Sequence, residues 1–253
     1  MKELKKHLRK THAIKTLIRR KGLFLTRAIS SVFLFTVILV DIFFQTNSVS
    51  RWIFHLTNIA LVMSFLYYTL LVLWFTSKFC DERARSKKIE TFFKCLYIQV
   101  FSAELFVSVI YWLFLYREHR RKCSFSKLKH FVNISSHSQC FLCFFEFLQN
   151  TMEIRFVHAF WSGLVFIVTF CLWFMFGAYI NRHESGELWS PYKRDAKTAE
   201  FHFLVELPSN ALIYGLFVFF SYMLHKKKTK YLIKKAYRKR EDQAAPHPAE
   251  QKQ

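Results

Sequence analysis

Glycine and proline are scarce in this chain, which has five glycines and four prolines among 253 residues. Five glycines leave little room for a phosphate-binding loop, and the sequence contains neither a G-x-S-x-G elbow nor an H-E-x-x-H helix. Zinc-finger, RNA-recognition and basic-region heptad patterns are also missing. The common motifs of soluble hydrolases, nucleotide-binding enzymes and nucleic-acid-binding proteins are therefore excluded, and we expect no nucleic acid among its partners.

A secreted disulfide framework is excluded as well. Four of the six cysteines fall inside apolar runs and two in basic loops, a distribution that does not suit such a framework. The first apolar run begins only around Leu23, after a long charged segment, and is too long for the apolar core of a signal peptide. We therefore expect no cleavable signal.

Apolar, aromatic and basic residues are abundant instead. Hydrophobic residues make up 53% of the chain and aromatic residues 19%, with 31 phenylalanines, and the net charge is +21. The charge is uneven, because ten Lys and Arg precede residue 28 and ten more follow residue 225. Basic ends that flank long apolar runs indicate a membrane protein whose termini attract anionic lipid headgroups.

The apolar runs predict an all-α polytopic membrane protein with six transmembrane helices. Each run is long enough to cross the apolar core of a bilayer, which takes about 20 residues. The expected spans are residues 23–44, 52–75, 92–116, 131–150, 157–180 and 201–224. The chain thus divides into a basic segment (1–22), a six-helix membrane domain (23–224) and a basic, partly disordered tail (225–253).

The basic loops predict the orientation, because short cytoplasmic loops are rich in Lys and Arg. The N-terminal segment, loop 78–88 and the C-terminal tail are basic, so both ends are expected in the cytoplasm. Loop 117–129 is basic but falls outside, so either the other loops outweigh it or the fourth segment is re-entrant. Arg27 is expected to snorkel to the interface. An aromatic belt is expected from side chains near segment ends, namely Trp52, Tyr111, Trp112, Trp189 and Tyr192.

The fourth segment is too polar to face lipid. It carries a polar run near one end and Glu146 deeper in, and unpaired polar groups in hydrocarbon cost several kcal/mol each. The run comprises Asn133, Ser135, Ser136, His137, Ser138 and Gln139. Because an ionisable residue inside a membrane marks a functional site by default, His137 is the centre of our hypothesis.

Thr57 is the second candidate, because it lies at a depth similar to that of His137 below the same face. A histidine suits the task of taking the proton of a threonine hydroxyl, so the pair is able to cleave an acyl ester. The candidate hydrogen-bond donors to the oxyanion are Asn58, Asn133, Ser136 and Trp189. Two simpler interpretations stay open: the threonine bonds its own helix, and the histidine makes a polar contact between helices.

Four stretches carry a resemblance to a known family. They are RWIFHLTNIALV (51–62), YWLFLYREH (111–119), FVNISSHS (131–138) and, more weakly, GELWSPY (186–192). They resemble the androgen-induced protein family, which includes the androgen-dependent TFPI-regulating protein, a family of six-span membrane hydrolases. The family's nucleophilic threonine falls on Thr57 and its asparagine on Asn133. Its catalytic histidine falls on His137 if one extra residue is allowed between them.

The resemblance implies a threonine hydrolase that cleaves fatty acid esters of hydroxy fatty acids. It implies a role in lipid metabolism. For an integral membrane protein with basic ends, the endoplasmic reticulum, another endomembrane and the plasma membrane all fit. The chain departs from the family at Ile134, where the family has histidine, and at Phe131, where it has tryptophan. A non-catalytic membrane scaffold, a transporter-like protein or an inactive family member is the alternative.

Other chemistries have weaker support in the sequence. The spacing of His137, Cys140 and Cys143 would put three metal ligands on one helix face, but one helix does not readily direct three short ligands at one ion. Haem ligation would draw on histidines that include some close to segment ends, namely His55, His137, His158 and His202. We predict neither cofactor nor metal. Glu146 and Glu206 are expected to pair with arginine or bond across helices, or else to orient His137.

Overall fold

The computed structural model describes residues 2–45, 52–80, 87–117, 127–150, 152–180 and 207–244. The helices in order are α1 (Lys2–Gln45), α3 (Leu56–Cys80), α4 (Lys87–Ile110), α6 (Lys127–His137), α7 (Cys140–Gln149), α8 (Phe156–Ile180) and α10 (Leu207–Ala244). A π-helical turn, η1 (Tyr111–Leu115), continues α4. The described residues contain no strand, so the all-α prediction is confirmed.

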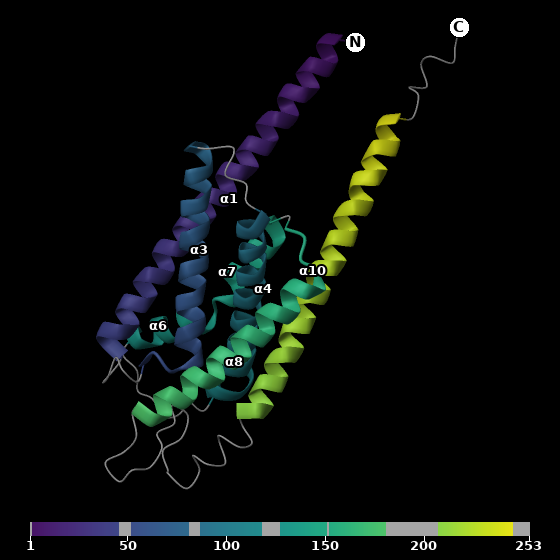
Figure 1. The fold of residues 1–253 in the computed structure, drawn as a ribbon. Helices are drawn as coiled ribbons and strands as arrows, with labels where there is room; N and C mark the ends of the chain where they lie inside the picture. Colours follow the sequence, from purple (N-terminus) through teal and green to yellow (C-terminus); the bar gives the residue numbers. More distant parts are fainter. Residues whose placement is uncertain are drawn as a thin grey trace.

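The long helices form a bundle with α4 at its centre (Figure 1). Helix α4 packs against α3, α7, α8 and α10, while α1 packs against α3 and α6. The fully buried side chains are mostly large and apolar or aromatic, and Tyr67, Tyr97, Leu61 and Ile98 are among them. The bundle therefore has one continuous core, built around the face that α4 shares with its neighbours.

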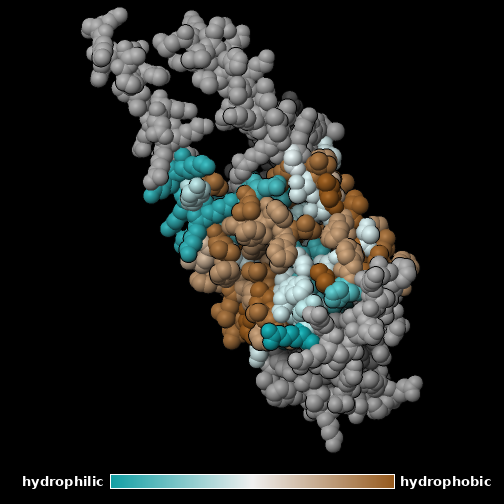
Figure 2. Space-filling model, turned by 180° about the vertical axis from the view of Figure 1, so that it is seen from behind, coloured by the Kyte–Doolittle hydropathy of each residue, from teal (hydrophilic) through white to brown (hydrophobic). Residues whose placement is uncertain are grey.

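Four helical stretches are long and apolar enough to cross a membrane: Gly22–Phe43, Leu56–Trp74, Lys88–Leu115 and Phe156–Ile180. Large apolar side chains cover the outer face of α8, where Phe160, Val165 and Leu172 are half or more exposed. Figure 2 shows hydrophobic residues over the middle of one face, with hydrophilic residues above and below them. A surface of this kind suits lipid, because soluble monomers rarely expose so large an apolar patch.

The fourth expected span is not one continuous helix. Helix α6 ends at His137 and α7 begins at Cys140, so Ser138 and Gln139 interrupt the segment. Helix α6 lies across the lower end of the bundle in Figure 1, against α1 and α3, whereas α7 packs along α4. The expected single helix 131–150 is therefore corrected to two short helices of 11 and 10 residues.

Two expected boundaries also differ. Helix α1 runs through 44 residues without a break, so the basic segment 1–22 is continuous with the first apolar helix. Helix α10 begins at Leu207 and continues for 38 residues into the basic tail, while residues 201–206 of the sixth expected span lie outside the described residues. The Lys2 end of α1 and the Ala244 end of α10 project from the same end of the bundle (Figure 1).

Candidate functional site

Thr57 lies in the first turn of α3, and one side-chain and two backbone hydrogen bonds hold the start of this helix. The Asn58 amide donates to the Trp52 carbonyl (2.8 Å), and the backbone N–H groups of Asn58 and Ile59 both donate to the carbonyl of His55 (3.0 Å each). Asn58 is therefore committed to shaping the helix start. Asn58 is buried, and its expected role as an oxyanion donor stays a prediction.

The Thr57 hydroxyl makes no hydrogen bond with the described residues, unlike other threonines of the long helices. Thr26, Thr36 and Thr76 each donate to the carbonyl four residues earlier, at 2.9 to 3.1 Å. The corresponding carbonyl for Thr57 belongs to Ile53, which precedes α3 and instead accepts the Trp173 indole N–H at 3.3 Å. In the described part of the chain the half-buried Thr57 hydroxyl therefore does not bond its own helix, unlike the simpler interpretation.

His137 is the last residue of α6, and an aromatic residue of η1 holds its ring. The rings of His137 and Tyr111 stack with centroids 3.6 Å apart and planes 4° from parallel. The Trp112 indole N–H donates to the His137 carbonyl at 3.2 Å. The Asn133 amide donates to the Tyr111 hydroxyl at 2.5 Å. The π-helical turn, a feature frequently found at functional sites, thus presents two successive aromatic residues to the end of α6.

The structure places Thr57 and His137 at the same end of the bundle but joins them by no hydrogen bond. Helix α6, which ends at His137, packs against α3, which starts just before Thr57. Of the expected oxyanion donors, Asn133 holds Tyr111, and the Ser136 hydroxyl donates to the Asn133 carbonyl (3.1 Å). Trp189 lies outside the described residues.

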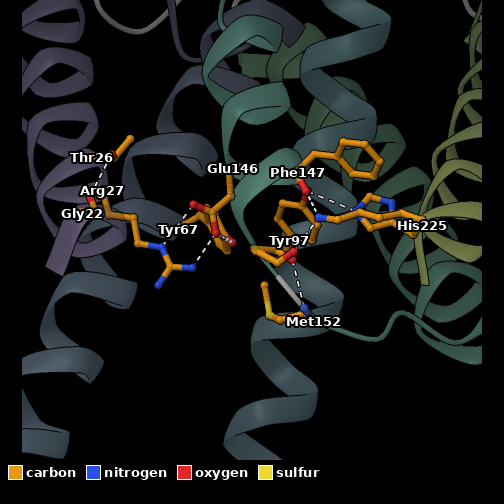
Figure 3. Close-up of polar contacts among 11 residues, drawn as sticks. Gly22, Thr26, Arg27, Tyr67, Tyr97, Glu146, Phe147, Met152 and His225 are labelled. Carbon is orange, nitrogen blue, oxygen red and sulfur yellow. Dashed lines mark hydrogen bonds and ion pairs between the residues drawn. The ribbon is translucent and has the colours of Figure 1, made fainter. Parts of the chain in front are cut away.

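Glu146 forms an ion pair with Arg27 deep in the bundle (Figure 3). The guanidinium of Arg27 donates to both carboxylate oxygens, at 2.5 and 3.2 Å, and the Tyr67 hydroxyl donates to one of them at 3.3 Å. The expected pairing of Glu146 with an arginine is therefore confirmed. The expected snorkelling of Arg27 is wrong, because its side chain is only 10% exposed and turns inward to the carboxylate.

A second polar cluster lies where α7 ends against α10. His225 bonds the Tyr97 hydroxyl (3.1 Å) and the Ser221 carbonyl (2.7 Å), and its ring meets that of Phe147 edge to face. The Lys228 ammonium donates to the carbonyls of Phe147 and Asn150. Figure 3 shows that His225 and Arg27 approach α7 from opposite sides.

The described residues contain no group of three or more His, Cys, Asp and Glu side chains that would hold a metal ion. The interruption after His137 separates it from Cys140, so H-x2-C-x2-C does not lie along one helix. His202, named above as an alternative haem ligand, lies outside the described residues. Glu206, whose expected partner was an arginine or a neighbouring helix, lies outside them as well.

Several residues with polar groups are buried in the helix bundle although the sequence did not predict their burial. Tyr111 and Trp52 were expected in an aromatic belt but are buried, at 3% and 7% exposure. Trp52 donates to the Asp41 carboxylate at 2.6 Å. Glu104 is buried in α4 and accepts a hydrogen bond from Ser64. The signal for Glu104 was present in the sequence, as a single acid within the apolar run 92–116.

Comparison of the chain with protein-family models, with curated proteins and with solved structures found no match. The resemblance to the androgen-induced family therefore stays a prediction.

Proposed function

We propose that the protein is a six-span membrane hydrolase that cleaves lipid esters with Thr57 as the nucleophile and His137 as the base. The observation that carries this proposal is the Thr57 hydroxyl, which makes no hydrogen bond with the described residues although three other helix threonines bond a carbonyl. Its place in the first turn of α3 adds the positive end of a helix dipole, which favours a developing oxyanion.

His137 supports the proposal because it is held from two sides. Tyr111 fixes the plane of its ring and Trp112 anchors its carbonyl. A base held in one orientation is pre-organised for proton transfer, and catalytic hydrogen bonds in unliganded sites often form only when substrate binds. The ester would enter between α3 and the end of α6 and bring the two side chains into one reaction.

The proposed reaction has two steps, acylation of Thr57 and hydrolysis of the acyl-threonine. The Thr57 oxygen adds to the ester carbonyl while His137 takes the hydroxyl proton, and the alcohol then leaves with that proton. Water next attacks the acyl-threonine, again with His137 as base, which releases the fatty acid and restores Thr57. The resemblance points to fatty acid esters of hydroxy fatty acids as the substrate. Endoplasmic reticulum or plasma membrane fits the anionic headgroups that the basic ends would attract.

The test is hydrolysis of a fatty acid ester of a hydroxy fatty acid by the purified protein in detergent. Thr57→Val keeps the side-chain shape and removes the hydroxyl, and His137→Ala removes the base. Thr76→Val is the matched control, because Thr76 bonds its own helix and is exposed. We expect activity in the wild type and in Thr76→Val, and its loss in the other two variants when each is folded. Activity that survives both site substitutions would reject the Thr57/His137 mechanism.

A transporter-like protein is the second candidate, and the interrupted fourth segment favours it. Paired half-helices inside a membrane are typical of transporters, whose substrate sites lie at such breaks. The two functions differ in their need for the hydroxyl, since a transport site at the α6–α7 break tolerates Thr57→Val. Folded wild-type protein without hydrolysis across several chain lengths would favour this second candidate.

A further inference from the structure

Glu104 is a buried acid that the proposed reaction does not use. It lies near the middle of the apolar stretch Lys88–Leu115 and is 1% exposed. The Ser64 hydroxyl donates to its Oε1 at 2.5 Å, whereas its Oε2 is buried and has no hydrogen-bond partner among the described residues. Buried polar atoms are almost always bonded, so an orphaned carboxyl oxygen indicates a ligand site.

The surroundings of Glu104 extend toward the interrupted helix. Glu104, Ser108 and Tyr111 recur at intervals of four and three residues and so share one face of α4 and its π-helical continuation. The Cys140 thiol, in the first turn of α7, lies close to both Glu104 and Ser108. Tyr111 stacks on His137 at the end of α6. This face of α4 therefore lies along the break between α6 and α7.

The break contributes a second orphaned oxygen. The Gln139 amide nitrogen donates to the Ser135 carbonyl at 2.6 Å, while its Oε1 is buried without a hydrogen-bond partner in the described part of the chain. Gln139 immediately precedes Cys140 at the start of α7, where the Cys143 N–H donates to the Gln139 carbonyl at 3.2 Å. Buried polar atoms without a protein partner are commonly bonded by ordered water molecules, each with two to four polar partners.

The charges that face Glu104 differ from those that face Glu146. Glu146 has the guanidinium of Arg27 as its counter-ion. Glu104 faces the Ser64 hydroxyl of α3 and the Cys140 and Cys143 thiols of α7, and no charged side chain in the described parts of α8 and α10 is paired with it. A carboxylate without a counter-ion in an apolar interior takes up a proton rather than staying charged.

We propose that Glu104, Ser108 and Gln139 form a water-binding site inside the membrane domain, and that Glu104 carries an exchangeable proton there. The site needs only hydroxyl, amide and carboxyl oxygens, the donors and acceptors that bind water. The water-binding site does not depend on the proposed hydrolysis, because Thr57 is not one of its residues. Gln139 follows His137 closely in the sequence. If the proposed hydrolysis holds, the site can supply the water that attacks the acyl-threonine.

Infrared spectroscopy of the full-length protein in a detergent without ester groups, at neutral pH, tests this site directly. A protonated carboxyl gives a carbonyl band that ionised carboxylates lack, and the band moves to lower frequency when D2O replaces the acid proton. We expect this band in the wild type and its loss in Glu104→Gln. Glu90→Gln is the matched control on the same helix, because Glu90 is exposed and pairs with Lys94, so its removal leaves the band unchanged.

Each result decides part of the proposal. A spectrum that is the same in wild type and in folded Glu104→Gln would show that Glu104 is ionised, and a band that does not move in D2O would show a dry site. Both overturn the proposal. Ser64→Ala provides an assignment that does not depend on the folding of Glu104→Gln. It removes the hydrogen bond to Oε1, so the Glu104 band moves to higher frequency if the carboxyl is protonated, and an unmoved band contradicts the proposal.

Discussion

The residues Arg27 and Glu146 form an ion pair whose two charges are both removed from solvent, with side-chain exposures of 10% and 1%. Glu146→Gln leaves the guanidinium buried without its counter-ion, and we expect it to lower the free energy of unfolding by about 3–5 kcal/mol. The double variant Arg27→Met/Glu146→Leu removes both charges and should recover most of that loss. Unfolding in mixed micelles with increasing dodecyl sulfate measures each value.

The exposed pair Glu90–Lys94 is the control for this prediction. Its oxygen and nitrogen are 2.8 Å apart, but the Glu90 side chain is 56% exposed. Solvent screens such pairs, so Glu90→Gln should cost less than about 1 kcal/mol. Equal losses in Glu146→Gln and Glu90→Gln would mean that burial does not govern the strength of the Arg27 pair.

Tyr111 is the residue that gives His137 its orientation, through a ring stack at 3.6 Å. Tyr111→Phe keeps the ring and loses one hydrogen bond to Asn133, so we expect the kcat of the proposed ester hydrolysis to fall about fivefold. Tyr111→Leu removes the ring, and a displaced base should lower kcat about 100-fold with little change in KM. Steady-state kinetics and the pH dependence of kcat measure both effects. Equal rates in the two variants would reject a positioning role for the Tyr111 ring.

At the scale of elements, helix α7 depends on a lysine from α10 for its end. The Lys228 ammonium donates to the carbonyls of Phe147 and Asn150, which would otherwise lack partners at the C-terminus of α7. Lys228→Met keeps the length of the side chain and removes the donor. We expect faster amide hydrogen exchange across α7 and no change in α3, measured by mass spectrometry.

Lys227→Met is the matched control for the α7 prediction, because Lys227 is the exposed neighbour of Lys228 on the same helix. It should leave the exchange of α7 unchanged. Protection of α7 that persists in Lys228→Met, or that falls equally in both variants, would contradict the capping role of Lys228.

The long helices were predictable from sequence, whereas their interruptions and partners were not. Length and apolarity located α3 and α8, because a span needs a long apolar run and little else. The helix breaks after His137 although no glycine or proline lies there. Contacts that the sequence does not show, such as the hydrogen bond from the Gln139 side chain to the Ser135 carbonyl, stabilise this break. Arg27 was misjudged because its partner Glu146 lies 119 residues away in the chain. The orientation of His137 depends on a π-helical turn that no residue pattern specifies.

At the scale of the whole molecule, the arrangement of α6 and α7 decides whether the fourth segment crosses the membrane. Together they run from the end of the bundle where η1 lies to the end where Asn150 bonds Lys228. If the segment crosses, Arg155 before α8 lies on the same side as Lys226 in α10, and Arg117 after η1 lies on the opposite side. All three are exposed. A re-entrant fourth segment would instead put Arg155 on the side of Arg117.

Single cysteine substitutions at these positions separate the two topologies. We expect a membrane-impermeant maleimide to label Arg117→Cys in intact cells, and to label Arg155→Cys and Lys226→Cys only after permeabilisation, with wild type as the blank for native thiols. The physical reason is that basic juxtamembrane residues are retained in the cytoplasm, and the basic run that follows Lys226 in α10 is the longest such feature at that end. Labelling of Arg155→Cys together with Arg117→Cys in intact cells would show that α6 and α7 enter and leave on one side, and the six-span topology would then be wrong.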